Sequence, residues 1–152
     1  LAAFLSGTEI TAYFSSPPFQ YQALEKPGVR RILNSYDITG GPASFLVTWA
    51  TSKFHDENPK TYKAFLAALT EAMQEIAKDR RAAAEIYLRL TKEKLTPDEV
   101  FELISDPDIE YTTTPKNMMK IVSFMAEAGH IKTPPKSWKD LFFPEVHNLP
   151  GS

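Results

Sequence analysis

The sequence predicts an α/β fold followed by a tail of helices. Residues 8–54 alternate short apolar runs with Gly, Pro and Ser, which is typical of strands joined by short turns. From residue 58 onward, apolar residues recur at helical spacing instead. Strands and helices that follow one another over short links indicate the α/β class.

The first part of the chain is expected to hold three strands. Leu1–Leu5 is predicted to be the end of a helix, because Gly7 follows it at the position where helices commonly stop. The breaks at Pro27-Gly28 and Gly40-Gly41-Pro42 divide what comes next. The expected elements are, in order, a strand at 8–14, a helix at 18–24, and strands at 29–33 and 43–51.

The second part is predicted to be helical. Asn58-Pro59 is a start signal, and one apolar stripe follows it: Tyr62, Phe65, Leu66, Leu69, Met73 and Ile76. Asp79 is expected to cap a second helix, and Thr96-Pro97-Asp98-Glu99 is a capping box for a third. Thr114-Pro115 is expected to start a fourth helix, and Ser137 a short capped turn.

Composition narrows the function classes. The chain has 152 residues, 43% of them hydrophobic, which is enough for one domain with a core. Its net charge of −2 argues against a nucleic-acid partner, which would need a basic face. There is no cysteine, so no disulfide, thiol nucleophile or Cys-ligated zinc is available. No apolar run is long enough to span a bilayer.

Ser15-Ser16-Pro17-Pro18 is the most informative stretch for binding. It lies between an expected strand and an expected helix. The first turn of a helix has unpaired N–H groups and the positive end of the helix dipole, so two hydroxyls there favour a small anion. The alternative is a capped helix with no ligand. The stretch therefore indicates capture of a small anionic solute, with plain capping left open.

Three further residues in the first part are candidates to contact a ligand. Tyr13 adjoins the two serines and either walls a ligand cleft or belongs to the core. Ser44 and Thr48 are hydroxyls in or beside an apolar run, and such groups need partners once buried. A ligand is one partner and the backbone is the more common one.

The histidines give no sign of catalysis. His55, His130 and His147 lack the spacing of a helical metal motif such as H-E-x-x-H. The His55-Asp56-Glu57 stretch is predicted to be a solvated loop before the long helix. The serines lack the G-x-S-x-G elbow of a nucleophile. We therefore expect no catalytic residue, no metal site and no cofactor.

The order and spacing of several motifs resemble those of a known family. The segment from Phe4 to Ala12 is similar to the L-x-S-G-E-I-D-A stretch of bacterial ABC-importer solute-binding proteins for nitrate, sulfonates and taurine. Thiamine-pyrimidine-synthesis-like proteins share the pattern. Thr11 departs from the acidic residue found there. The other matching stretches are Pro18-Phe19, Pro27-Gly28-Val29, Asn58-Pro59, Phe124 to Ile131, and Trp138-Lys139-Asp140-Leu141-Phe142-Phe143.

This resemblance implies the second half of a type II periplasmic binding protein, in which two α/β lobes close over a ligand. Residues 1–45 would form part of the second lobe. Residues 46–57 would be a hinge strand and its return, and residues 58–152 would be helices packed on a first lobe whose sheet is largely absent.

The resemblance also implies a function. The chain would be the periplasmic, non-enzymatic receptor of an importer, delivering a small anionic, organosulfur or nitrogen compound to a membrane permease. By position in the family, the ligand-contacting residues would be Tyr13, Ser15, Ser16, Ser44 and Thr48. Two other classes stay open: a thiamine-pyrimidine-synthesis-type enzyme on the same fold, and the ligand-sensing domain of a transcription regulator.

Overall fold

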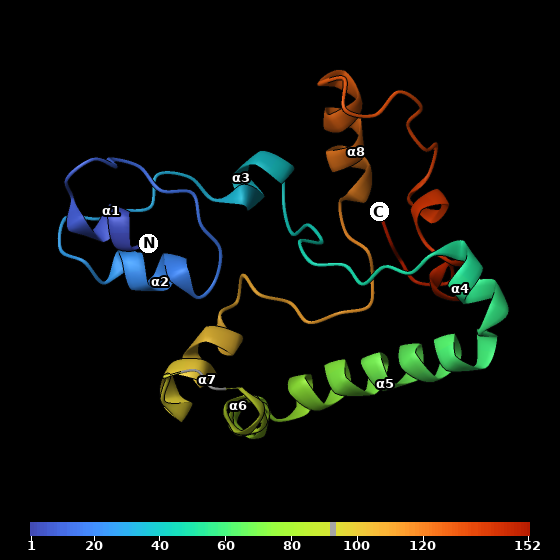
Figure 1. Ribbon diagram of the computed structural model, residues 1–152, viewed down its shortest axis with the longest axis horizontal. Helices are drawn as coiled ribbons and strands as arrows, with labels where there is room; N and C mark the ends of the chain where they lie inside the picture. Colours follow the sequence, from blue (N-terminus) through green and yellow to red (C-terminus); the bar gives the residue numbers. More distant parts are fainter. Residues whose placement is uncertain (92–93) are drawn as a thin grey trace. The chain divides into compact units, whose positions relative to one another are not determined.

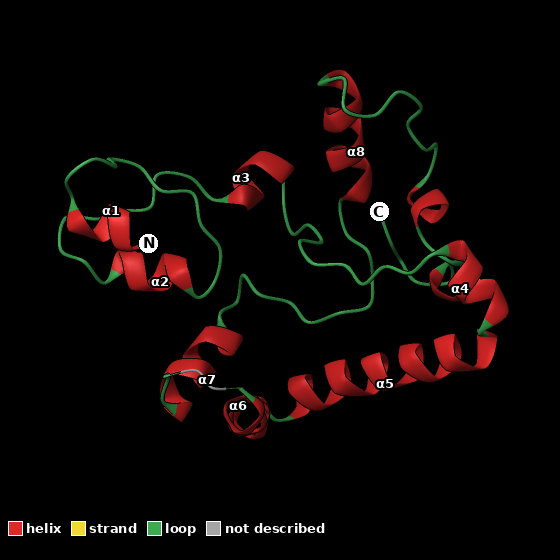
Figure 2. Cartoon of the chain, in the orientation of Figure 1, coloured by secondary structure: helices red, strands yellow, loops and turns green. Residues whose placement is uncertain are grey.

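The chain is helical in the computed structural model, which describes residues 1–91 and 94–152 (Figures 1 and 2). The elements are α1 (Ala2–Ser6), α2 (Phe19–Leu24), α3 (Ser35–Thr39), α4 (Ser52–Glu57), α5 (Pro59–Lys78), α6 (Arg80–Leu90), α7 (Pro97–Ser105), α8 (Met118–Glu127) and the 3₁₀ turns η1 (Trp138–Leu141) and η2 (Pro144–Val146). No strand occurs in these described residues. The predicted α/β class, and with it the two-lobed binding-protein architecture, is therefore wrong.

The three predicted strands are irregular segments. Residues 8–14, 29–33 and 43–51 have no regular secondary structure, and Figure 2 draws them as loops. In the third, Leu46 is 86% exposed and Trp49 is 82% exposed. An apolar run predicts a strand only where a neighbouring strand pairs its N–H and C=O groups. None of the described segments supplies such a neighbour, so the pattern alone was misleading.

The chain divides into two compact units, residues 1–34 and 35–152. The first contains α1 and α2. Gly7 ends α1 in the left-handed conformation (φ 71°), and its N–H donates to the Phe4 carbonyl, as the sequence predicts. The ammonium group of Lys26 donates to the Leu5 carbonyl, so it ties the end of α1 to the chain just after α2. The predicted helix at residues 18–24 is confirmed as α2.

In the second unit, α6 and α7 pack against each other. Each of the two helices has one of the most deeply buried apolar side chains, Ala84 in α6 and Val100 in α7. The Arg80 guanidinium donates to the Ile104 carbonyl over 2.8 Å, and Arg81 pairs with Asp98 over the same distance. These contacts make the α6–α7 pair a local packing unit with its own small core.

The predicted helix starts are largely confirmed. Asp79 accepts from the Ala82 N–H and so caps α6. In the capping box of α7, Thr96 Oγ1 accepts from the Glu99 N–H, and the Glu99 carboxylate accepts from the Thr96 N–H. The long helix α5 begins at Pro59 as expected, although the Asn58 side chain donates to the Phe54 carbonyl instead of capping it.

The last predicted helix starts later than expected. It runs as α8 from Met118, not from Thr114, because Asn117 takes a left-handed conformation (φ 51°) just before it. The Met118 N–H donates to the carbonyl of Ser152, whose own N–H donates to the Pro115 carbonyl. These bonds hold the final residues of the chain against the start of α8. Gly129 follows α8 in a positive-φ conformation, which is common just after the end of a helix.

The capped turn predicted at Ser137 is confirmed as η1. Its Ser137 hydroxyl accepts from the Lys139 N–H, and the Asp140 carboxylate accepts from the Ser137 N–H. Trp138 is buried at this turn. Among the described residues, no helix is both long and apolar enough to cross a membrane.

Candidate functional site

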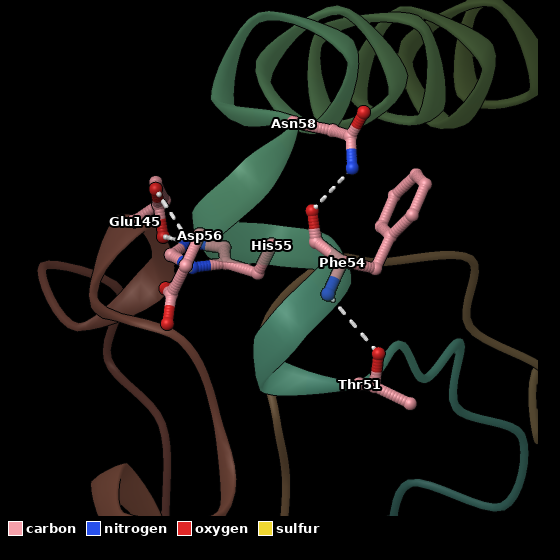
Figure 3. Close-up of polar contacts among 6 residues, drawn as sticks. All are labelled: Thr51, Phe54, His55, Asp56, Asn58 and Glu145. Carbon is pink, nitrogen blue, oxygen red and sulfur yellow. Dashed lines mark hydrogen bonds and ion pairs between the residues drawn. The ribbon is translucent and has the colours of Figure 1, made fainter.

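A single-turn helix places one histidine at the meeting point of three elements. Thr51 caps α4 by accepting from the Phe54 N–H over 3.1 Å, and the Asn58 amide donates to the Phe54 carbonyl over 3.0 Å where α4 ends (Figure 3). These two bonds fix both ends of α4. The side chain of His55, in the middle of this turn, contacts residues of α5 and of the segment around η2.

His55 lies between two carboxylates. Its Nδ1 is 2.8 Å from Asp56 Oδ1, and its Nε2 is 3.1 Å and 3.3 Å from the two carboxylate oxygens of Glu145 (Figure 3). The side chain of His55 is 17% exposed and that of Glu145 is 26% exposed, whereas Asp56 is largely in solvent. The imidazole thus has one carboxylate at each nitrogen.

Two aromatic rings complete the arrangement. Phe143 stacks on the imidazole with the ring centroids 4.1 Å apart and the planes 5° from parallel. Tyr62 of α5 meets the imidazole edge to face at 4.7 Å. We refer to His55, Asp56, Tyr62, Phe143 and Glu145 as the His55 cluster. It joins α4, α5 and the η2 segment by apolar contact as well as by charge.

The electrostatics of the His55 cluster favour a protonated imidazole. The hydrogen bond to Asp56 raises the pKa of His55 above 6.5; burial opposes this, and the hydrogen bond and charge of Glu145 add to it. Burial alone would raise the pKa of Glu145, but its own backbone N–H, His55 and Lys63 outweigh this and hold that pKa below 4.5. Both shifts favour the charged form of each partner, with a carboxylate at each nitrogen of the ring.

This arrangement holds a proton more readily than it transfers one. An imidazolium donates from both nitrogens, and here both are already engaged by carboxylates. A general base would need a free nitrogen directed at a substrate. Within residues 1–91 and 94–152, no group of three or more His, Asp or Glu side chains is arranged to hold a metal ion. The geometry thus gives the His55 cluster a role in holding the second unit together.

The prediction of a solvated loop at His55-Asp56-Glu57 is wrong about the loop, because these residues belong to α4. Asp56 and Glu57 are exposed as expected, whereas the His55 side chain is largely buried. A local signal was present, because Thr51 directly precedes the helix that begins at Ser52 and its side chain accepts from the Phe54 N–H, as a capping residue does. Glu145 lies 90 positions away in the sequence, so no local pattern could pair it with His55.

Three of the predicted ligand contacts lie in the first unit. Tyr13 stacks on Phe4, with the ring centroids 5.4 Å apart. The Ser15 hydroxyl donates to the Ser16 carbonyl over 3.4 Å, and both serines are half-buried in an irregular segment before α2. Tyr13 therefore packs against another aromatic ring, and the serines lie next to one another as the sequence requires.

The other two predicted ligand contacts, Ser44 and Thr48, lie in the second unit. Ser44 has backbone partners: its N–H donates to the Lys116 carbonyl over 2.9 Å, and its hydroxyl accepts from the Lys116 N–H over 3.0 Å. Thr48 is exposed in an irregular segment. Within either unit, the structure therefore gathers no site from all five predicted residues. The more common alternative for Ser44, pairing with the backbone, is the one observed.

A concave surface occurs elsewhere in the second unit. A groove of about 380 Å³ lies between α3 and α8. Its lining is mainly apolar, with polar groups at Thr39, Lys120, Ser123 and Glu127. Gly40, in a positive-φ conformation after α3, leaves room for the Lys120 ammonium group, which lies 3.3 Å from where a Cβ would be. None of the five predicted residues lines this groove.

The comparisons with known proteins do not assign the chain to a family. No protein-family model, characterised protein or solved structure matches it. The resemblance to importer receptors therefore remains a hypothesis that rests on the sequence motifs.

Proposed function

We propose that this chain belongs to a solute-binding component of an importer, which binds a small anionic, organosulfur or nitrogen compound without changing it and passes it to a membrane permease. The proposal keeps the function implied by the motif order and separates it from the two-lobed fold, which the helical structure overturns. The nitrate, sulfonate and taurine class of solutes is the first to test.

The observation that carries this proposal is the groove between α3 and α8. Small-molecule sites are concave and mostly apolar, with a few polar groups that fix the ligand's orientation. Here Ile38, Ile121 and Phe124 would contact the apolar body of a solute, and the Lys120 ammonium would pair with its anionic group. An alkanesulfonate or an aromatic carboxylate has both parts.

The groove differs from the site expected at Ser15 and Ser16, and one experiment separates them. A thermal-shift screen of the chain would use nitrate, taurine, alkanesulfonates, aromatic carboxylates and pyrimidines. A ligand at a hundredfold excess over its Kd stabilises the native state by about 2.7 kcal/mol, which is roughly 5–10 °C for a chain of this size.

Variants then locate the site. Binding in the groove predicts that Lys120→Met abolishes the shift, whereas the exposed control Lys132→Met and the double variant Ser15→Ala with Ser16→Ala retain it. Loss of the shift in the double serine variant alone would instead place the solute before α2. No shift with any compound would contradict the proposed function and favour the enzyme or sensor alternatives.

A further inference from the structure

One imidazole ring cannot satisfy two carboxylates unless it is charged. The neutral form carries a single N–H, so one of its nitrogens presents a lone pair. In the His55 cluster both nitrogens face carboxylate oxygens, at 2.8 Å for Asp56 and 3.1 Å for Glu145. Loss of the proton therefore sets a nitrogen lone pair against a carboxylate, and that contact changes from attractive to repulsive.

The geometry indicates which contact is lost. Asp56 is the next residue along α4 and makes the shorter of the two bonds, so the neutral ring keeps its hydrogen on Nδ1. Glu145 belongs to η2, and its bond to Nε2 joins segments 90 positions apart in the sequence. The contact that fails on deprotonation is thus the long-range one between α4 and η2.

We propose that the His55 cluster is a proton-controlled latch, which holds the η2 segment on α4 while His55 is protonated and loosens it when His55 is neutral. The latch lies within the second unit and does not depend on the proposed solute. Phe143 stacks on the ring, and because such stacking does not require a charged ring, we expect the release to be a local loosening and not an unfolding of the unit.

The other groups around the ring do not reproduce this behaviour. On α4 the neighbouring acid is Asp56. On α5, burial raises the pKa of Tyr62 above 10, and Lys63 attracts the Glu145 carboxylate. On η2, the Glu145 pKa lies below 4.5. Between the lowered pKa of Glu145 and the raised pKa of Tyr62, His55 is the member of the cluster whose charge changes near neutral pH.

Amide substitutions test the chemistry of the latch directly. In Glu145→Gln, the amide accepts from a protonated Nε2 and donates to a neutral one, so the contact survives at either pH. In Asp56→Asn, the amide donates to Nδ1 of the neutral ring, whose hydrogen then moves to Nε2 and reaches Glu145. Both variants are therefore expected to stay latched when His55 loses its proton.

Spin labels report the latch without changing it. The chain has no cysteine, so Ser52→Cys and Asn148→Cys, both exposed, would be its sole thiols and would carry nitroxides at α4 and just beyond η2. Distance distributions would be recorded at about pH 5.5 and about pH 9, on either side of the ordinary His range. Glu57→Gln, an exposed acid on the same helix, is the matched control.

The proposal predicts one narrow distribution at low pH and, at high pH, a several-fold larger population at longer distance. The Glu57→Gln control should repeat this change, while Glu145→Gln and Asp56→Asn should keep the narrow distribution at both values. An unchanged distribution in the unsubstituted chain would overturn the latch. So would a change that persists in both amide variants of the cluster, since the release would then come from another group.

Discussion

The contact between α6 and α7 should respond measurably to Val100→Ala. Val100 of α7 is 2% exposed and Ala84 of α6 is 0% exposed. The substitution removes two buried carbons, worth about 0.8 kcal/mol each, and leaves a small cavity that adds to this cost. Alanine forms helices better than valine by roughly 0.5 kcal/mol, which offsets the cavity. We therefore expect a net loss of about 1.5 kcal/mol.

Hydrogen exchange of the α6 and α7 backbone amides measures this loss locally. A change of about 1.4 kcal/mol corresponds to roughly tenfold faster exchange for amides protected by that packing. Glu102→Ala, an exposed position on the same helix, is the control and should change exchange much less. Equal effects of the two substitutions, or no effect of Val100→Ala, would refute the reasoning that buried packing stabilises this pair.

Three further predictions follow from local contacts. Thr96→Ala removes one half of the capping box of α7 and should cost about 1 kcal/mol in α7 stability, seen as faster exchange of its first-turn amides, with Thr96→Ser as the retaining control. Gly151→Ala should loosen the end of the chain, because its Cβ would lie 2.8 Å from the Trp138 ring, and a rise in Trp138 mobility by NMR checks this. His55→Gln should lower the free energy of unfolding, measured in urea, more below pH 6.5 than above the raised pKa of His55. A group with a raised pKa stabilises the fold while it is protonated, and this stabilisation is lost as the pH rises through that pKa.

Each of these has a contrary outcome. Unchanged exchange in Thr96→Ala would show that Pro97 and packing hold the α7 start without the cap. An unaltered Trp138 in Gly151→Ala would mean that the last residues are free of the ring. A His55→Gln effect that grows with pH would mean that the folded state favours the neutral imidazole, opposite to the expected sign.

Helix ends were predictable because their signals are local. Asp79, Thr96 and Ser137 each satisfy N–H groups two or three positions away, so the residues that decide the structure are adjacent in the sequence. Gly7 ends α1 for a similar reason, since a left-handed residue closes the helix through its own N–H. A capping residue and the N–H group that it satisfies therefore lie within the same few residues of the sequence.

Strands were not predictable in the same way. The run from Phe45 to Trp49 has the apolar, β-branched and aromatic residues of a buried strand, but its hydrogen-bond partners must come from distant chain. The pattern specifies what a strand would need and not whether the rest of the chain provides it. The short helices α3 and α4 were missed because five or six residues give too little periodicity to detect, whereas α1 and α2, which are equally short, were predicted from the Gly and Pro residues beside them.

In the candidate site, too, features set by neighbouring residues were predictable and features set by residues far apart in the sequence were not. Adjacent hydroxyls at Ser15 and Ser16 were visible in the sequence, yet nothing local indicated that Ser44 would bond to Lys116. The His55 cluster depends on Glu145 and Phe143, which come from the far end of the chain. A site whose residues lie far apart in the sequence can be predicted only after the fold is known.

The exposed apolar segment at residues 45–49 has a consequence for the handling of this protein. It is uncharged, rich in aromatic and aliphatic residues and free of proline, which is the composition that stacks into cross-β aggregates when left uncovered. Purified material should therefore lose soluble protein as concentration rises, with thioflavin-positive deposits seeded from this stretch. A single gatekeeper charge, Leu46→Lys, should keep the chain in solution without touching the helices.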